Sequence, residues 1–148
     1  LLIVMIVRAE TSAPSFWPNP TEVSNGNVSL LLPSTFSFEL TGIAASSSIL
    51  KRGVLRYENL ILQGVEDCLD SSSVIDTLPK CSIEILSTTD DPENEAETLT
   101  LDVDESYDIA VAVDPEPDCS ITAVNLWGAL HALETFAQSL ERQQLPAT

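Results

Sequence analysis

Two segments of the chain carry apolar residues at helical spacing. In residues 47–63 and again in residues 125–140, apolar side chains recur at +4, +7 and +11, which places them in one stripe along a helix. The stripe residues are Leu50, Val54, Tyr57, Ile61 in the first segment and Leu126, Leu130, Leu133, Ala137 in the second. Ser47 or Ser48 can cap the first helix, and Gly64 can end it. The pattern therefore predicts two amphipathic helices.

Other segments alternate apolar and polar residues, as strands with one buried face do. Residues 34–40 alternate best, because Phe36, Phe38 and Leu40 fall on one face. Further strands are predicted at 28–32, 82–86, 99–101, 107–113 and 121–124. The proline-broken residues 10–26 predict an extended lead-in. This order favours an α+β fold, with a mostly antiparallel sheet and the two main helices on one face of it.

The first nine residues suggest secretion. The run Leu1–Val7 is apolar, is too short to span a bilayer as a helix, and is typical of the hydrophobic region of a signal peptide. Val7-Arg8-Ala9 fits a cleavage site after Ala9, although no initiator methionine or basic segment precedes the run. We therefore expect residues 1–9 to be the remnant of a secretory signal peptide. A buried first strand of the fold is the alternative.

Two further features fit the same compartment. Asn27-Val28-Ser29 is an N-glycosylation sequon, so Asn27 is predicted to be exposed and glycosylated. The chain has three cysteines, which suits an oxidising compartment without requiring one. Cys68 and Cys81 flank a short polar loop and could close it as a disulfide, which would leave Cys119 free. These features predict a protein of the secretory pathway.

The formal net charge of −17 excludes some partners. It argues against nucleic acid and against stable binding to an anionic membrane, since both are negatively charged. Residues 66–118 hold 17 of the 23 acids, which indicates a solvated acidic face or, as the alternative, a divalent-cation site. Asp102, Asp104 and Ser106 resemble the start of a calcium loop, but Tyr107 and Val113 stand where an EF-hand needs Gly and Glu. We predict no metal and no cofactor.

His131 and Glu134 lie three residues apart, on the same side of the second helix. A metalloprotease of the His-Glu-x-x-His type needs two histidines for its zinc, and the chain contains one. A surface or domain-interface pair is therefore the prediction for these two side chains.

The second helix carries a family resemblance. Its segment 125–138, NLWGALHALETFAQ, closely resembles the WGALRGLETFSQL segment of the family 20 β-hexosaminidases. Weaker matches follow the family's order: Phe16-Trp17-Pro18, Leu32–Phe38, Arg56-Tyr57 and Glu105–Val111. The chain departs from the family where Ser46-Ser47-Ser48 and the loop 90–97 replace two cysteines, so the family's disulfide is not carried over.

The resemblance implies a zincin-like, non-catalytic N-terminal domain at 27–141, with residues 142–148 starting a linker to a (β/α)8 barrel. The barrel would remove terminal N-acetylglucosamine or N-acetylgalactosamine, with the substrate's own acetamido oxygen as nucleophile, in a lysosomal, vacuolar or extracellular setting. The family's catalytic Asp-Glu pair follows a His-x-Gly-Gly pattern, which this chain lacks, so Asp104-Glu105 is not expected to be catalytic. We predict no catalytic residue in these 148 residues.

The second helix also has apolar residues outside its stripe, namely Trp127, Phe136 and Leu140. A helix so broadly apolar packs on more than one side, so these three residues are the predicted contacts to the barrel. Trp127 as a sugar platform is the weaker interpretation. The rival to a support domain is a stand-alone secreted module that binds glycans or a partner enzyme. Homo-oligomerisation is left open.

Overall fold

The structure, a computed structural model, describes residues 2–6, 16–17, 19–24, 26, 28–63, 76–86 and 102–143. In chain order the elements are β1 (Leu2–Ile6), β2 (Ser29–Leu31), β3 (Ser37–Thr41), η1 (Gly42–Ser46), α1 (Ser48–Leu62), β4 (Lys80–Ile85), β5 (Tyr107–Ala112), β6 (Asp118–Ala123), α2 (Leu126–Gln138) and β7 (Glu141–Gln143). The predicted helices and most predicted strands are present. The strand predicted at 99–101 lies outside the described residues.

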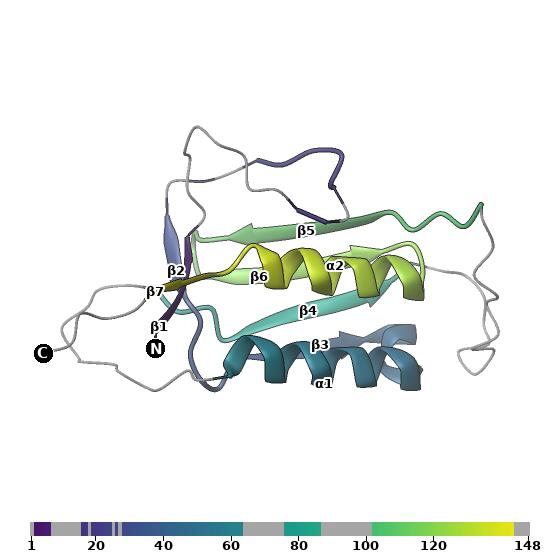
Figure 1. The fold of residues 1–148 in the computed structure, drawn as a ribbon, viewed down its shortest axis with the longest axis horizontal. Helices are drawn as coiled ribbons and strands as arrows, with labels where there is room; N and C mark the ends of the chain where they lie inside the picture. The colour runs from purple at the N-terminus through teal and green to yellow at the C-terminus, as the bar shows by residue number, and fades with distance from the viewer. Residues whose placement is uncertain are drawn as a thin grey trace, which may run out of the picture.

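The main sheet has the strand order β3-β4-β6-β5 (Figure 1). β3 runs parallel to β4 and β4 parallel to β6, whereas only β5 is antiparallel to its neighbour. The expectation of a mostly antiparallel sheet was therefore wrong. One cause is α1, which returns the chain to the starting end of the sheet between β3 and β4, so that β4 points the same way as β3. The other is the position of β5 at the edge, which places β6 beside β4 in the same direction.

Both helices lie on one face of this sheet, side by side, as the sequence predicted (Figure 1). They approach closely at Gly53 of α1, where an added Cβ would stand 2.6 Å from the Cδ2 atom of Leu130 on α2. The absence of a side chain at Gly53 thus brings the two helices together over the strands.

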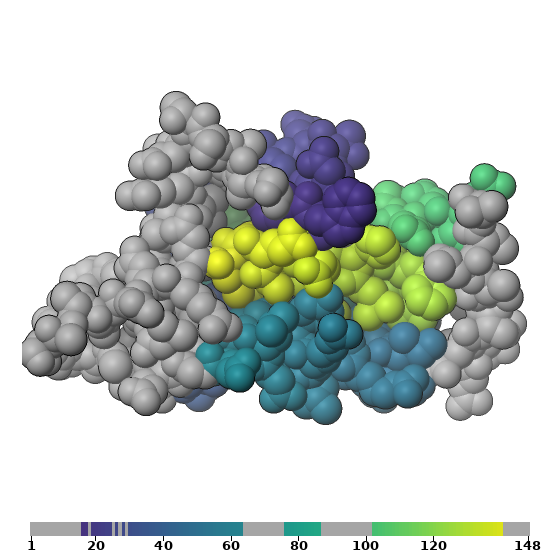
Figure 2. Space-filling view, viewed as in Figure 1, coloured from purple at the N-terminus to yellow at the C-terminus, as the bar shows by residue number. Residues whose placement is uncertain are grey.

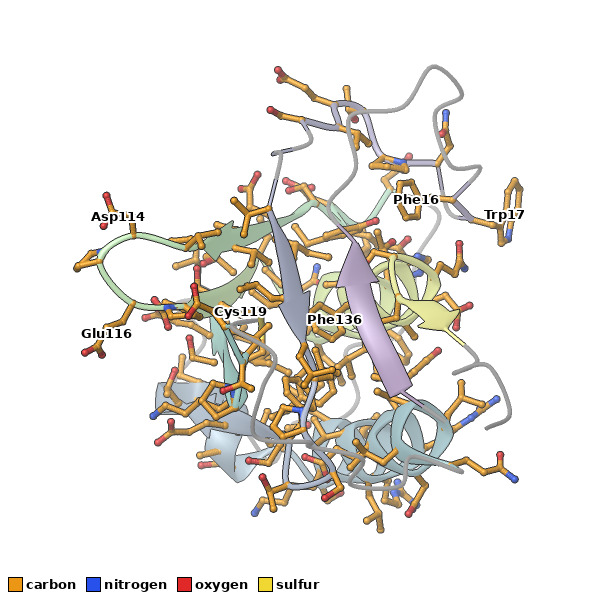
Figure 3. The ribbon with its side chains drawn as sticks, turned by 90° about the vertical axis from the view of Figure 1, so that its left-hand side faces the viewer. Phe16, Trp17, Asp114, Glu116, Cys119 and Phe136 are labelled. Atoms are coloured by element: carbon orange, nitrogen blue, oxygen red, sulfur yellow. A yellow bond between two sulfur atoms is a disulfide. The ribbon has the colours of Figure 1, made fainter. Side chains whose placement is uncertain are left out.

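The hydrophobic core fills the space between the helices and the main sheet. Alternate residues of β4 and β6 point into it, including Ile83 and Ile121, while their neighbours face away. Three aromatic rings form its centre: Phe136 of α2 stacks on Phe36 at 5.8 Å between centroids and meets Phe38 edge-on at 5.4 Å. Figure 3 shows Phe136 in the interior between the two layers.

A second, three-stranded sheet has the order β2-β1-β7, with both outer strands antiparallel to β1. The segment Leu2–Ile6 thus forms the central strand of this sheet. Cleavage after Ala9 concerns processing of the precursor and remains a prediction. β7 lies at Glu141–Gln143, where we expected the domain to pass into a linker.

The cysteine pairing differs from the prediction. Cys81 of β4 is bonded to Cys119 of β6, and the two Cα atoms are 4.5 Å apart. This corrects the Cys68–Cys81 pairing, since one sulfur forms one disulfide; Cys68 lies outside the described residues. The reason is sheet register, because Ser82 pairs with Ser120 and the preceding residues of the two parallel strands therefore face each other.

Among the described residues, no helix is both long and apolar enough to cross a membrane.

Candidate functional site

Helix α2 starts at a tightly packed turn. The side chain of Asn125 caps the helix by accepting a hydrogen bond from the Gly128 N–H at 2.9 Å. The same side chain donates from Nδ2 to the carbonyl oxygen of Asp104 at 2.6 Å. One buried amide thereby fixes the first turn of α2 against the segment 104–106, which leads into β5.

This close contact requires a residue without a side chain at position 128. An added Cβ would lie 2.8 Å from the carbonyl oxygen of Ser106 and 3.0 Å from that of Glu105, both of them backbone atoms. Real Cβ atoms do not approach that closely, so the segment would have to move.

We expect Gly128→Ala to lower the free energy of unfolding by about 1–3 kcal/mol, as overpacking does, despite the higher helix propensity of alanine. Urea unfolding of the 148-residue chain measures it. Gly53→Ala is the matched control, because its Cβ meets only the tip of the flexible Leu130 side chain and should cost less. Equal effects at the two glycines would contradict this account of Gly128.

Asp104 and Glu105, the pair that mimics a catalytic Asp-Glu, have structural partners here. Asp104 Oδ1 accepts a hydrogen bond from the Ser106 N–H at 3.0 Å, and hydrogen bonds from the Ser106 side chain and backbone lower the pKa of its carboxyl. Glu105 Oε2 lies 3.4 Å from His131 Nε2 on α2. The Asp104 carboxylate thus orders the segment before β5, and the Glu105 carboxylate contacts the helix.

A polar network joins α1, α2 and the segment before β2. The Tyr57 hydroxyl of α1 donates to Glu134 Oε2 of α2, and Gln138 Nε2 donates to Glu134 Oε1 at 2.7 Å. Gln138 also binds the backbone of Trp17 twice, donating to its carbonyl oxygen at 2.6 Å and accepting from its N–H at 2.7 Å. His131 and Glu134 thus contact different residues of the domain, Glu105 and Tyr57, and a role of the two side chains at a surface or domain interface stays a prediction.

The network shifts two pKa values in opposite directions. Burial, and then the hydrogen bond to Glu134, raises the pKa of Tyr57 to about 12. The hydrogen bonds from Tyr57 and then Gln138 hold the pKa of Glu134 below its ordinary value of 4.5. Each shift means that the folded state favours neutral Tyr57 beside ionised Glu134.

Tyr57→Phe is expected to cost about 1 kcal/mol of stability near neutral pH, a typical value for a partly exposed hydrogen bond to a carboxylate. The depressed pKa of Glu134 gives stability that is present above pH 4.5 and lost as the pH falls through the lowered value. The raised pKa of Tyr57 gives stability that is present below pH 10 and lost as the pH rises toward 12. Thermal unfolding of both proteins across pH should therefore show a difference that shrinks at both ends. A difference independent of pH would contradict the network.

The outer surface of α2 is less apolar than predicted. Phe136 is completely buried in the domain's own core, so its assignment as a barrel contact was wrong. The stripe residues Leu126 and Leu133 are buried as predicted. Elsewhere the buried face follows Ala129, Ala132 and Phe136, each one position before a stripe residue, because alanines and Gly128 let the helix lie close to the sheet. Trp127 and Leu140 are half-buried, and the indole N–H of Trp127 is buried without a hydrogen-bond partner among the described contacts.

The most exposed large apolar side chain of the described residues is Trp17, at 80%. The segment around residues 16–24 lies against the C-terminal half of α2 (Figure 2). Figure 3 shows the indole of Trp17 pointing away from the body of the molecule. Gln138 thus fixes the backbone of a residue whose side chain has no cover within the described part of the chain.

Within that same part of the chain, no group of three or more His, Cys, Asp or Glu side chains is arranged to hold a metal ion. The Tyr57–Glu134–Gln138 network and the backbone of Trp17 meet at the outer face of the two helices.

Sequence comparison agrees with the resemblance in α2. Residues 16–139 match the family model described as β-acetyl hexosaminidase like. The chain belongs to this family. It corresponds to the N-terminal domain of the eukaryotic β-hexosaminidases. The matched range begins at Phe16 and thus includes the segment that Gln138 binds.

Two curated relatives are similar to the chain over most of its length. Beta-hexosaminidase 1 of Arabidopsis thaliana is 32% identical over 93% of this chain and 28% of its own length. Beta-hexosaminidase subunit B2 of Dictyostelium discoideum is 33% identical over 85% of this chain and 20% of its own length. The chain thus spans only 20–28% of the length of these relatives. No solved structure gives a significant match.

Proposed function

We propose that this domain supports the catalytic barrel of a β-N-acetylhexosaminidase. The observation that carries the proposal is the family match over 16–139, together with the share of 20–28% that the chain covers of its relatives. In this proposal a (β/α)8 barrel follows the domain and removes terminal β-linked N-acetylglucosamine or N-acetylgalactosamine by substrate-assisted retaining hydrolysis. The zincin-like classification of the domain is part of the same proposal.

The test is hydrolysis of an aryl N-acetylglucosaminide by the chain continued through its native downstream region, beside the 148-residue chain. We expect turnover from the longer protein alone. An Asp104→Asn, Glu105→Gln double variant of the longer protein should keep the catalytic constant, because these acids bind Ser106 and His131. The proposal would be refuted if the 148-residue chain hydrolysed the substrate and the same double substitution in that chain abolished the hydrolysis. A reading frame that stops soon after Thr148 would favour the stand-alone module.

The barrel is proposed to dock on the outer face of the helices. Trp17 is the main candidate contact, because its backbone is fixed while its indole is 80% exposed, and an ordered exposed tryptophan loses little entropy on binding. Trp127 and Leu140, which the sequence also predicts as barrel contacts, are half-buried candidates near the two ends of α2. The glycoside substrate would be bound by the barrel, and this domain would contribute rigidity.

Secretion is the proposed route of this protein. The Cys81–Cys119 disulfide and the family membership are consistent with the secretory pathway. Lysosomal, vacuolar or extracellular delivery, removal of residues 1–9 and a glycan on Asn27 belong to the proposal. Asn27 lies outside the described residues, but its neighbours Gly26 and Val28 are exposed. A mass loss on deglycosylation of protein secreted from a eukaryotic host is expected, and none would be seen in Asn27→Gln.

A further inference from the structure

Strand β1 occupies the central position of the second sheet, between β2 and β7. Its backbone pairs with β2 through Val4 to Ile6 and with β7 through Leu2 to Val4, antiparallel in both cases. Figure 1 shows the three strands together at the end of the molecule where α2 ends. Without β1, the two outer strands would flank a gap one strand wide.

The gap would leave backbone groups of β2 unpaired. The backbone groups of Leu31 point away from β1, toward residues 76–78. Its N–H donates to the Asp76 carbonyl oxygen at 2.9 Å, and its carbonyl oxygen accepts from the Leu78 N–H at 2.9 Å. Backbone groups of successive strand residues point to opposite sides, so those of Leu30 point toward β1, where Met5 pairs with Leu30. Orphaned backbone groups beside a core residue are costly.

The gap would also uncover an apolar side chain. Leu30 and Leu32 point into the hydrophobic core, and alternation puts Leu31 on the opposite face of β2. Leu31 is nevertheless only 3% exposed, although it is not a member of the core cluster. Its cover therefore comes from outside the core, and its strand partner is Val4 of β1.

The occupant of this position is the segment whose sequence is typical of a signal peptide. Cleavage after Ala9 would remove all of β1 and leave both the Leu30 backbone and the Leu31 side chain in need of a new partner. The present occupant, an extended segment with the apolar sequence LIVMI, shows that the position accepts an apolar strand.

We propose that the position between β2 and β7, the β1 seat, receives an extended apolar segment of the catalytic region that follows β7 in the full protein. This inference rests on the proposed function. An occupant must run antiparallel to β7, and a strand that follows β7 through a tight turn has that direction automatically. A second copy of the chain is disfavoured as occupant, because each copy carries a formal net charge of −17.

The test uses the longer protein, continued through its native downstream region and lacking residues 1–9. Hydrogen exchange should show the Leu30 amide exchanging at least about 100-fold more slowly than an unprotected amide, at every protein concentration. The amide of Ile83, inside the main sheet, is the control for an intact fold. Photo-leucine, an isosteric replacement, should cross-link from position 31 to a peptide of the catalytic region.

Three results would overturn the inference. The first is free exchange of Leu30 while Ile83 stays protected. The second is protection or cross-linking that requires a dimer. The third is a secreted protein whose N-terminal sequence still contains residues 2–6 and whose position 31 cross-links to them. Each result can be distinguished from a failure of the proposed function, because the same preparation can be assayed for hydrolysis. An active enzyme whose Leu30 amide exchanges freely would refute the proposal about the β1 seat and leave the proposed function intact.

Discussion

Phe136→Ala should lower the free energy of unfolding of this domain by about 3–5 kcal/mol, the cost of deleting a fully buried phenylalanine and leaving a cavity. The ring is completely buried, stacks on Phe36 and meets Phe38 edge-on, so α2 loses its aromatic contact with β3 and the residue before it. A loss of this size approaches the whole stability of a small domain. We expect partial unfolding at room temperature, visible as a broadened thermal transition in near-ultraviolet circular dichroism.

Leu55→Ala is the matched control on α1, because Leu55 is 60% exposed and should cost less than about 0.5 kcal/mol. The comparison separates burial from hydrophobicity. If Phe136→Ala were as mild as Leu55→Ala in the 148-residue chain, Phe136 would have to face outward, as the sequence stripe alone suggested.

The second large effect is expected at the disulfide. Cys81 and Cys119 are separated by 38 residues, and closing a loop of that length stabilises the native state by about 4 kcal/mol in the chain-entropy treatment. The Cys81→Ala, Cys119→Ala double variant should therefore lose roughly that amount in urea unfolding. Both sulfurs are buried in the core, so alanine is preferable to a polar replacement.

The control is Cys68→Ala, which should leave stability and the disulfide intact. Peptide mapping of non-reduced protein gives the pairing directly, and a cross-linked peptide containing Cys81 and Cys119 is expected. A Cys68–Cys81 peptide, or a large stability loss in Cys68→Ala, would contradict the structure.

The helices were predictable because their signal is local. Apolar spacing alone placed α1 and α2, and the need of both to cover a sheet placed them on one face. Strand direction was not predictable in this way, since it depends on which strands become neighbours after the α1 crossover. The disulfide failed for the same reason: Cys81 and Cys119 are distant in sequence but opposite each other in the sheet.

The site was harder to predict than the fold. Phe136 lies one position outside the predicted stripe, and only the small residues Gly128 and Ala132 beneath α2 reveal how far the helix is turned toward the sheet. The two hydrogen bonds between Gln138 and the Trp17 backbone join residues 121 positions apart, and no local pattern predicts such a contact. The family resemblance includes the Trp17 segment as a shared feature but does not indicate which residues that segment contacts.

The central claim is that this domain supports a catalytic barrel through its helix face, and Trp17→Ala tests it most directly. In the longer protein the variant should lower the stability of the whole by about 2 kcal/mol, as loss of an interface anchor does, and should lower the melting temperature measured by calorimetry. In the 148-residue chain the same variant should leave the melting temperature nearly unchanged, because the indole is 80% exposed and Gln138 binds only the backbone. Equal melting temperatures for the longer protein with and without Trp17→Ala would contradict docking at this face.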